Sequence, residues 1–372
     1  MNKPLKTIKV LIVDDSPFIR MSLKKILDRD PGIEVVDTAR DGREGITKLQ
    51  ALKPDVVTMD VEMPVMNGLQ ALEEIMRWQP TPIIILSSVT TEGAKLTIKA
   101  FDLGAAEVVA KPSGKAGDDL VALAEDLTLK VKSVAGIDPK RLKNRTIDCR
   151  GIVPTPVSKP KNLDLKTEPK GTGLSTWPRK NIEVVAIGTS TGGPTALQIV
   201  LSKLPKNFPV PVIVSQHMPV GFTLSLASRL DSLSEVKIKQ VENDEVLKPG
   251  TVYIGEAGKQ FQVKKDRNEL VAVITTESPI NTLYKPSVDV MFMSLAKVVG
   301  GGVLGVVMTG MGTDGSQGMQ ELKNQGAFAI AESETTCIVY GMPRSIVERG
   351  LADRIEQLPN IGQAIIDCVN RR

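Results

Sequence analysis

Short runs of valine and isoleucine recur along this chain, and segments with helical spacing of apolar residues follow most of them. Five such runs precede residue 137, with helical patterns between them, as over 43–52 and 68–78. Short strands that are apolar throughout are typical of parallel sheets covered on both faces. We therefore expect a doubly wound α/β fold with its site at the carboxyl ends of the strands. The expected strands are Lys9–Asp15, Glu34–Ala39, Val56–Asp60, Ile83–Ser87 and Glu107–Lys111.

A similar alternation returns after residue 180. The region 236–276 instead predicts an antiparallel excursion, with turns at 249–250 and 265–268. A closing helix over 361–369 is expected to pack on the sheet. The pattern indicates a second α/β domain with a mostly parallel sheet. Its expected strands are Ile182–Gly188, Val210–Gln216, Val303–Thr309 and Ala327–Ala331.

A basic, proline-rich segment separates the two alternating parts. Residues 138–180 carry eleven Lys or Arg and four Asp or Glu, a surplus of 7, so the remainder of this +4 chain is close to −3 (4 minus 7). Such segments bury too little apolar surface to offset the entropy of ordering them. We expect one globular unit over 1–125, its terminal helix and a linker over 126–180, and a second unit over 181–372.

Composition argues against several classes of protein. No run approaches the roughly 18 apolar residues of a membrane span, and the N-terminus has no apolar signal core, so a cytoplasmic protein without membrane insertion is expected. Aromatic residues are only 3% of the chain and the basic surplus lies in the connector, so no nucleic-acid partner is expected. Three dispersed cysteines and one histidine do not suit a disulfide framework or a structural zinc site.

Charged and hydroxyl side chains stand at the expected strand ends of the first unit. They are Asp14 and Asp15 after the first strand, Asp60 at the third, Ser87 at the fourth and Lys111 at the fifth. Three neighbouring carboxylates repel one another unless a cation compensates, and Mg²⁺ takes a few carboxylates while keeping several waters. A carboxylate can then attack a phosphoryl group whose oxygens the cation and a lysine neutralise. The pattern predicts a Mg²⁺-dependent phosphoryl acceptor.

The second unit holds the only histidine of the chain, His217, at the end of an expected strand. Ser190 stands in the glycine-rich turn 188–193 between a strand and a helix, which matches a nucleophile-elbow pattern. Asp314 lies in another glycine-rich loop, 310–315. If the protein is a serine hydrolase, His217 must be the base, and Asp314 is suited to hold its imidazole. The helix start after the serine would direct free amides at an oxyanion.

Structural interpretations of the same residues stay open. A glycine-rich turn after a strand often binds phosphate, although here neither the dinucleotide pattern nor the Walker lysine is present. A lone histidine beside a proline turn is usually structural, and Asp314-Gly315 also suits a turn. The residues alone support a catalytic triad and a structural cluster about equally.

Residues 7–125 resemble the receiver domain of bacterial two-component response regulators. The resemblance implies phosphorylation of Asp60, Mg²⁺ binding by Asp14, Asp15 and Asp60, and contacts from Ser87 and Lys111 to the phosphoryl oxygens. It also implies a cis bond between Lys111 and Pro112. Many receivers have an aromatic switch residue where this chain has Val108, so no aromatic switch is expected.

Residues 182–370 resemble the catalytic domain of chemotaxis protein-glutamate methylesterases. The motifs follow in the family's order: Gly188–Gly193, Gln216–Thr223, Pro286–Asp289, Gly310–Gly315 and Tyr340–Pro343. The resemblance implies that Ser190 is the nucleophile, His217 the base and Asp314 the orienting acid. It further implies that Thr191 supports the histidine, that the Met311 amide contributes to the oxyanion hole, and that this site uses no cofactor.

Together the resemblances imply an esterase controlled by phosphorylation. A histidine kinase is the expected phosphodonor, and methyl-accepting chemoreceptors are the expected substrates, with methanol released from glutamyl methyl esters. Deamidation of receptor glutamines is implied as well. The unphosphorylated receiver is expected to cover the Ser190 cleft. The alternatives are a non-enzymatic regulator that only binds a partner, and an esterase whose methylated substrate lies outside swimming control.

This chain departs from the family pattern at two places, and both are expected to lie near the mouth of the site. The family often has histidine at the position of Gln260, and His-Arg at the positions of Tyr284 and Lys285. These differences predict an altered substrate preference or affinity. Arg344 is expected either to contact substrate or to belong to a surface helix cap.

Overall fold

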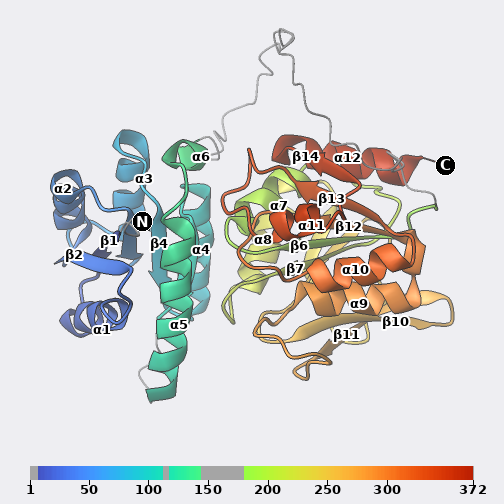
Figure 1. The fold of residues 1–372 in the computed structure, drawn as a ribbon, viewed down its shortest axis with the longest axis horizontal. Coiled ribbons are helices and arrows are strands. Elements are labelled where there is room, and N and C mark those ends of the chain that lie inside the picture. Colours follow the sequence, from blue (N-terminus) through green and yellow to red (C-terminus); the bar gives the residue numbers. More distant parts are fainter. Residues whose placement is uncertain (1–6, 112–116, 144–179, 372) are drawn as a thin grey trace, which may run out of the picture.

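The computed structural model describes residues 7–111, 117–143 and 180–371, and it contains two α/β units packed side by side (Figure 1). The first unit runs through the blue and teal elements and the second from green to red. Within these ranges, no helix combines the length and the apolarity needed to cross a bilayer.

The first unit is built on a five-stranded parallel sheet in the order β2-β1-β3-β4-β5. Its strands are β1 (Ile8–Val13), β2 (Ile33–Ala39), β3 (Val56–Asp60), β4 (Ile83–Ser87) and β5 (Glu107–Ala110). All five agree with the predicted runs to within two residues at either end. β3 and β4 are buried along their whole length, as their unbroken apolar sequences require.

Helices cover both faces of this sheet. They are α1 (Pro17–Leu27), α2 (Gly42–Leu52), α3 (Gly68–Trp78), α4 (Thr91–Asp102) and α5 (Gly117–Val134). Helices α1 and α5 contact each other, while α2, α3 and α4 contact in series. Local signals set where they begin: the Ser16 hydroxyl accepts from Ile19 N at the start of α1, and Asn67 and Gln70 form a capping box at α3. The doubly wound fold is confirmed.

The second unit is built on a seven-stranded sheet in the order β14-β13-β12-β6-β7-β9-β8, with every pair parallel. The strands predicted here are β6 (Val184–Thr189), β7 (Val212–Gln216), β12 (Val303–Val307) and β13 (Phe328–Glu332). The helices are α7 (Gly193–Leu201), α8 (Thr223–Leu233), α9 (Val288–Val298), α10 (Ser316–Asn324), α11 (Met342–Glu348) and α12 (Leu358–Asn370). The expected closing helix is α12, which contacts α7, β13 and β14.

The expectation of an antiparallel excursion over 236–276 is only partly right. β8 (Lys237–Gln240) and β9 (Thr251–Ile254) join the main sheet as parallel strands. Only β10 (Gln260–Asp266) and β11 (Glu269–Thr275) pair antiparallel, through a tight turn at Arg267 and Asn268, whose φ angles are 46° and 73°. β8 is a four-residue edge strand and β14 (Arg354–Glu356) a three-residue one, too short to show a period in sequence.

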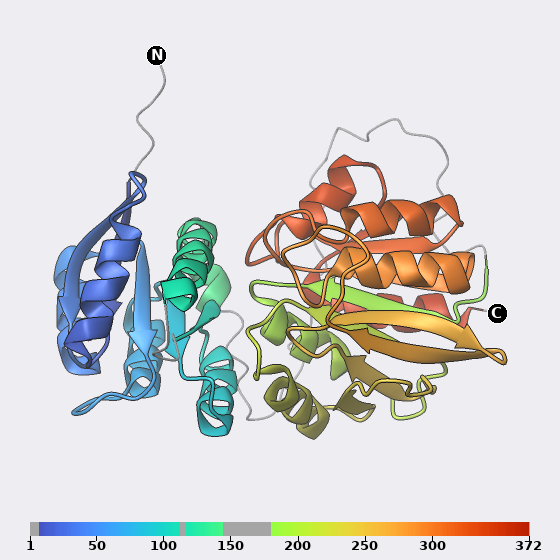
Figure 2. The ribbon, with the colours of Figure 1, turned by 90° about the horizontal axis from the view of Figure 1, so that it is seen from below.

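The two units contact each other through α4 and a short helix, α6 (Pro139–Lys143) (Figure 2). Arg229 of α8 lies 2.9 Å from Asp102 of α4. Leu142 of α6 is buried, and Arg141 donates to the carbonyl oxygens of Glu334 at 3.0 Å and Cys337 at 2.9 Å. This part of the predicted linker is therefore folded, because it finds partners on the second unit. Residues 144–179 lie outside the described residues.

Candidate active site

Ser190 stands where β6 ends and α7 is about to begin. Its backbone N–H donates to Thr309 O at 3.0 Å, which ties the turn to the loop after β12. Two glycines let this turn pack closely: Gly192 has φ 76°, and a Cβ on Gly310 would lie 2.8 Å from the Ser190 Cβ. The serine is half-buried and lines a cavity of about 460 Å³. This is the strand–turn–helix context that the sequence pattern predicts.

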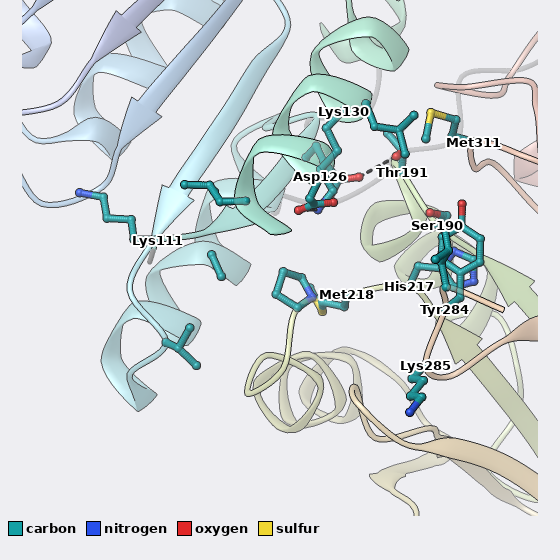
Figure 3. A pocket seen from close by; sticks show the side chains of 17 residues that line it. Lys111, Asp126, Lys130, Ser190, Thr191, His217, Met218, Tyr284, Lys285 and Met311 are labelled. Carbon is teal, nitrogen blue, oxygen red and sulfur yellow. Dashed lines mark hydrogen bonds and ion pairs between the residues drawn. The ribbon is translucent and has the colours of Figure 1, made fainter. Parts of the chain in front are cut away.

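His217 follows β7, next to β6, and lines the same cavity (Figure 3). Its backbone N–H donates to Thr189 O at 3.1 Å. The imidazole Nε2 lies 2.7 Å from Asp314 Oδ2. Its Nδ1 is buried and has no hydrogen-bond partner among the described residues. The acid thus occupies one ring nitrogen, and among the described residues no hydrogen bond joins the other nitrogen to the Ser190 hydroxyl.

Asp314 belongs to the loop before α10, and its carboxylate lies against the N-terminal end of α9. Its Oδ1 accepts from the Ser287 hydroxyl at 2.8 Å and from Asp289 N at 3.1 Å, and its Oδ2 accepts from Val288 N at 2.7 Å. Burial alone would raise the pKa of Asp314, but the hydrogen bond and charge of His217 and the helix amides outweigh it, so the pKa is lowered. Asp314 is therefore held as a carboxylate beside the imidazole.

The groups that bind the Asp314 carboxylate belong to the Pro286–Asp289 motif, to whose residues the family resemblance assigned no role. Ser287 is the N-cap of α9 and its hydroxyl also accepts from Val290 N. Asp289 accepts from Gly318 N at 2.7 Å, and burial, with the nearby Asp314 charge, raises the pKa of Asp289 to about 6. A serine before an apolar helix predicts a helix N-cap. The sequence does not show that the Asp314 carboxylate would bind at that cap.

Thr191 does not make the contact expected of it. Its hydroxyl donates to Glu107 Oε2 at 2.6 Å, across the junction with the first unit, and no hydrogen bond joins it to His217. The side chain stacked on the imidazole is that of a different residue, Tyr284. The Tyr284 ring lies flat against the His217 ring, with centroids 4.0 Å apart and planes 4° from parallel.

The residues that depart from the family pattern do not all lie at the mouth of the cavity. Tyr284 and Lys285 line the cavity, whereas Gln260 is fully buried. The Gln260 amide donates to Tyr284 O at 2.9 Å and accepts from Ser287 N at 2.8 Å, so it fixes the loop rather than facing the opening. Arg344 is mostly exposed and pairs with Glu348 at 2.6 Å along α11, which favours the surface-helix role.

Both units contribute to the walls of the cavity (Figure 3). Ser190, His217 and Met311 lie on the second unit, while Asp126 and Lys130 reach the cavity from α5 of the first. Met311 lies in the glycine-rich loop that also carries Asp314, which places its backbone beside the serine turn. The first unit therefore forms part of the wall of this cavity.

The acidic cluster of the first unit also assembles as expected. Carboxylate oxygens of Asp14, Asp15 and Asp60 lie within 4.8 Å of one another. Lys111 Nζ lies 2.9 Å from Asp14 and 2.6 Å from Asp60. Burial raises the pKa of Asp60, and the Asp14 charge adds to this, although Lys111 opposes both. Three crowded oxygen donors with one lysine fit a hard divalent cation such as Mg²⁺.

Other residues of the first-unit site are also located. Ser87 is buried at the end of β4, and its hydroxyl donates to Gly93 O at 3.2 Å. Val108 is buried inside β5. A valine has no aromatic ring that could change rotamer at this position. The bond from Lys111 to Pro112 lies outside the described residues.

Two family models match the chain, one for each unit. The response regulator receiver domain matches residues 10–124, and the CheB methylesterase matches residues 185–365. A protein-glutamate methylesterase/protein-glutamine glutaminase of Desulfitobacterium hafniense is 56% identical over the whole of both chains. Proteins of the same name from Oleidesulfovibrio alaskensis and Nitratidesulfovibrio vulgaris are 41% and 43% identical, each covering 97% of this chain and 99% of the relative. The chain therefore belongs to the CheB methylesterase family, with an N-terminal response regulator receiver domain.

Proposed function

We propose that this chain is a phosphorylation-controlled esterase that hydrolyses glutamyl methyl esters on chemoreceptors and deamidates receptor glutamines. The observation that carries the proposal is the imidazole of His217, held at Nε2 by Asp314 while its buried Nδ1 has no partner among the described residues. Ser190 lines the same cavity next to the start of α7. These are the parts that acyl transfer by a serine requires.

In the first half-reaction Ser190 Oγ attacks the ester carbonyl carbon, and its proton passes to Nδ1 of His217. Negative charge on the carbonyl oxygen faces the Met311 amide and the N-terminal end of α7. Asp314 stabilises the imidazolium through Nε2. The bond to the methoxy oxygen then breaks, methanol takes the proton from Nδ1, and the glutamyl group remains on Ser190.

In the second half-reaction a water molecule replaces methanol. His217 Nδ1 takes a proton from the water, which attacks the acyl carbon, and the serine leaves with that proton. The product is a receptor glutamate carboxylate. With a glutamine substrate ammonia leaves in place of methanol, and the remaining steps are the same. The scheme uses no cofactor at this site.

The receiver domain supplies the control. Asp60 accepts a phosphoryl group from a histidine kinase, and Asp14, Asp15 and Asp60 are the residues that would hold Mg²⁺. A bound Mg²⁺ would supply positive charge to the phosphoryl oxygens. Lys111, which contacts Asp60 at 2.6 Å, and Ser87 are the groups of the chain that meet the same oxygens.

Strand β5 joins the two sites. Its first residue, Glu107, binds Thr191 next to the nucleophile, and Lys111 follows its last residue beside Asp60. A receptor helix about 10–12 Å across needs the cavity to open on the receiver side. A new anion at Asp60 that draws Lys111 would disturb β5 and loosen this cover. A coupling free energy of about 1–3 kcal/mol is sufficient for such control.

The test is methanol release from a methylated chemoreceptor cytoplasmic fragment, with and without Mg²⁺ and acetyl phosphate. We expect slow release from the chain alone and faster release with the phosphodonor. Equal methanol release in both conditions would contradict control by phosphorylation but would still support the esterase activity. No release in either, with Asp60 verified as phosphorylated, would support a domain that only binds its partner or a different methylated substrate.

A further inference from the structure

One aromatic side chain covers a face of the proposed base. The Tyr284 and His217 rings are 4.0 Å apart at their centroids and 4° from parallel, which makes them a parallel stack (Figure 3). The phenol end extends toward the glycine-rich loop of Asp314, since a Cβ added to Gly312 would lie 3.4 Å from the Tyr284 hydroxyl oxygen. Tyr284 therefore spans the histidine and the loop that carries its acid.

The backbone of Tyr284 is fixed from within the protein. Gln260, fully buried, donates to Tyr284 O at 2.9 Å and to the Ser278 hydroxyl at 3.2 Å. The same amide accepts from Ser287 N at 2.8 Å, so one side chain links both ends of the loop 278–287. Tyr284 N also donates to the Thr282 hydroxyl at 3.2 Å. These hydrogen bonds fix the backbone from which the Tyr284 ring extends.

The base needs such a contact because Asp314 holds the imidazole at a single atom. A hydrogen bond at Nε2 sets the direction of that nitrogen but leaves the ring free to tilt about the bond. Tilting changes the direction of Nδ1, and small misplacements of a general base cost acyl-transfer rate. A flat ring at 4.0 Å blocks the tilt toward its own side. An aromatic face also attracts a cation, so it favours the imidazolium that forms during reaction.

We propose that Tyr284 is a positioning residue for His217, which fixes the tilt of the imidazole and stabilises its protonated form through the ring face. The proposal rests on the function given above, because it takes His217 as the base. It assigns the effect to the aromatic ring and gives the phenol hydroxyl no proton-transfer role. Burial, reinforced by the charges of Asp314 and Asp126, raises the pKa of Tyr284, so the hydroxyl stays neutral where the enzyme works.

Several charged groups surround the histidine. Asp314 contacts Nε2, and Asp289 stands behind Asp314 on α9. Asp126 and Lys130 line the cavity from α5, and Lys285 lines it beside Tyr284. A substitution of Tyr284 changes none of these charges. A change in His217 titration between Tyr284→Phe and Tyr284→Leu therefore reports on the ring.

The single histidine makes the test direct. In full-length protein labelled at histidine with ¹³C and ¹⁵N, every imidazole signal belongs to His217. We expect ring-current shifts in the wild type that persist in Tyr284→Phe and disappear in Tyr284→Leu. The titration midpoint of the leucine variant should move to lower pH, because the imidazolium loses the ring face. Identical signals and midpoints in wild type and Tyr284→Leu would show that the Tyr284 ring does not act on the imidazole, and would overturn the proposal.

Kinetics on the phosphodonor-activated full chain provide the second measurement. Tyr284→Leu should lower kcat about tenfold with KM nearly unchanged, and Tyr284→Phe should retain most of the activity. Trp78→Leu, on the exposed end of α3, is the matched control for losing an aromatic ring and should behave as wild type. Equal losses in the phenylalanine and leucine variants would assign the effect to the hydroxyl and overturn the proposal. So would a shifted imidazole signal with unchanged kcat.

The two proposals fail separately. If Ser190→Ala retains methanol release, the proposed mechanism is wrong, whatever the spectra show. If Ser190→Ala is inactive but the leucine variant keeps full kcat, only the role of Tyr284 is lost. Thermal melts of each variant verify that the protein remains folded.

Discussion

The Thr191 hydroxyl donates a 2.6 Å hydrogen bond to the Glu107 carboxylate, and both residues are buried where the two domains meet. The other Glu107 oxygen accepts from Val108 N at 2.9 Å. A hydroxyl bound to a buried carboxylate is a strong contact, because the charge has few alternative partners. It joins the first residue of β5 to the residue after Ser190. Separation of the domains must break it.

Glu107→Gln should raise basal methanol release. The amide keeps the shape of the side chain but removes the charge that strengthens the contact, so the closed arrangement loses about 1 kcal/mol. We expect a rise of about fivefold without phosphodonor, with the stimulated rate little changed. Glu73→Gln, on the exposed surface of α3, is the matched control. Unchanged basal release in Glu107→Gln would mean that this bond does not restrain the domains.

Asp60→Asn should preserve basal esterase activity and remove the response to acetyl phosphate. The amide cannot accept the phosphoryl group, while the cavity around Ser190 is left intact. The check is methanol release at increasing phosphodonor concentrations, alongside a direct assay of phosphorylation. Stimulation equal to that of wild type would place the switch outside the receiver site.

Ser190→Ala should lower methanol release by about a thousandfold or more, because the acyl group then has no oxygen to bond to. Phosphorylation of the receiver should be unaffected, since its acidic cluster lies on the other domain. The measurement pairs methanol release with incorporation of labelled phosphate. Robust hydrolysis by the alanine variant would exclude a serine mechanism.

Asp289→Asn should stabilise the protein more at pH 7.5 than at pH 5. The pKa of Asp289 is raised from its ordinary value of 3.8 to about 6, so the folded chain holds this proton over a window where the unfolded chain has lost it. Its contribution to stability is fully present below about pH 4 and is lost as the pH rises through 6. The asparagine variant escapes that loss. Thermal midpoints of both proteins at the two pH values provide the comparison, and a gain that is larger at pH 5 would contradict the assignment.

The sheets and the strand-end residues were predictable from sequence, because each signal was local. β3 and β4 are five-residue apolar runs, and the parallel topology brings Asp14, Asp60 and Lys111 to one edge. The parallel pairing of β8 and β9 was not predicted, because a four-residue strand at or near a sheet edge shows almost no hydrophobic periodicity. Their parallel pairing depends on neighbours distant in sequence.

The site shows the same division. Ser190 and Asp314 stand in glycine-rich turns, and His217 is the only histidine of the chain. The orientation of Thr191 was not predictable, because its partner Glu107 belongs to the other domain and was read only as the start of a strand. Gln260 and Tyr284 looked alike as departures from a family pattern, yet one is buried under the loop and the other covers the base. A side chain takes its direction from contacts that a linear sequence does not show.

The face formed by α4 and β5 of the receiver is already occupied. α4 contacts α7 and α8, its Asp102 pairs with Arg229 at 2.9 Å, and β5 carries the bond to Thr191. A protein that recognises this face must compete with the methylesterase domain for it. By mass action, such a competitor would itself act as an activator, even without phosphorylation. The resting activity would then depend on the concentration of any such competitor as well as on phosphorylation.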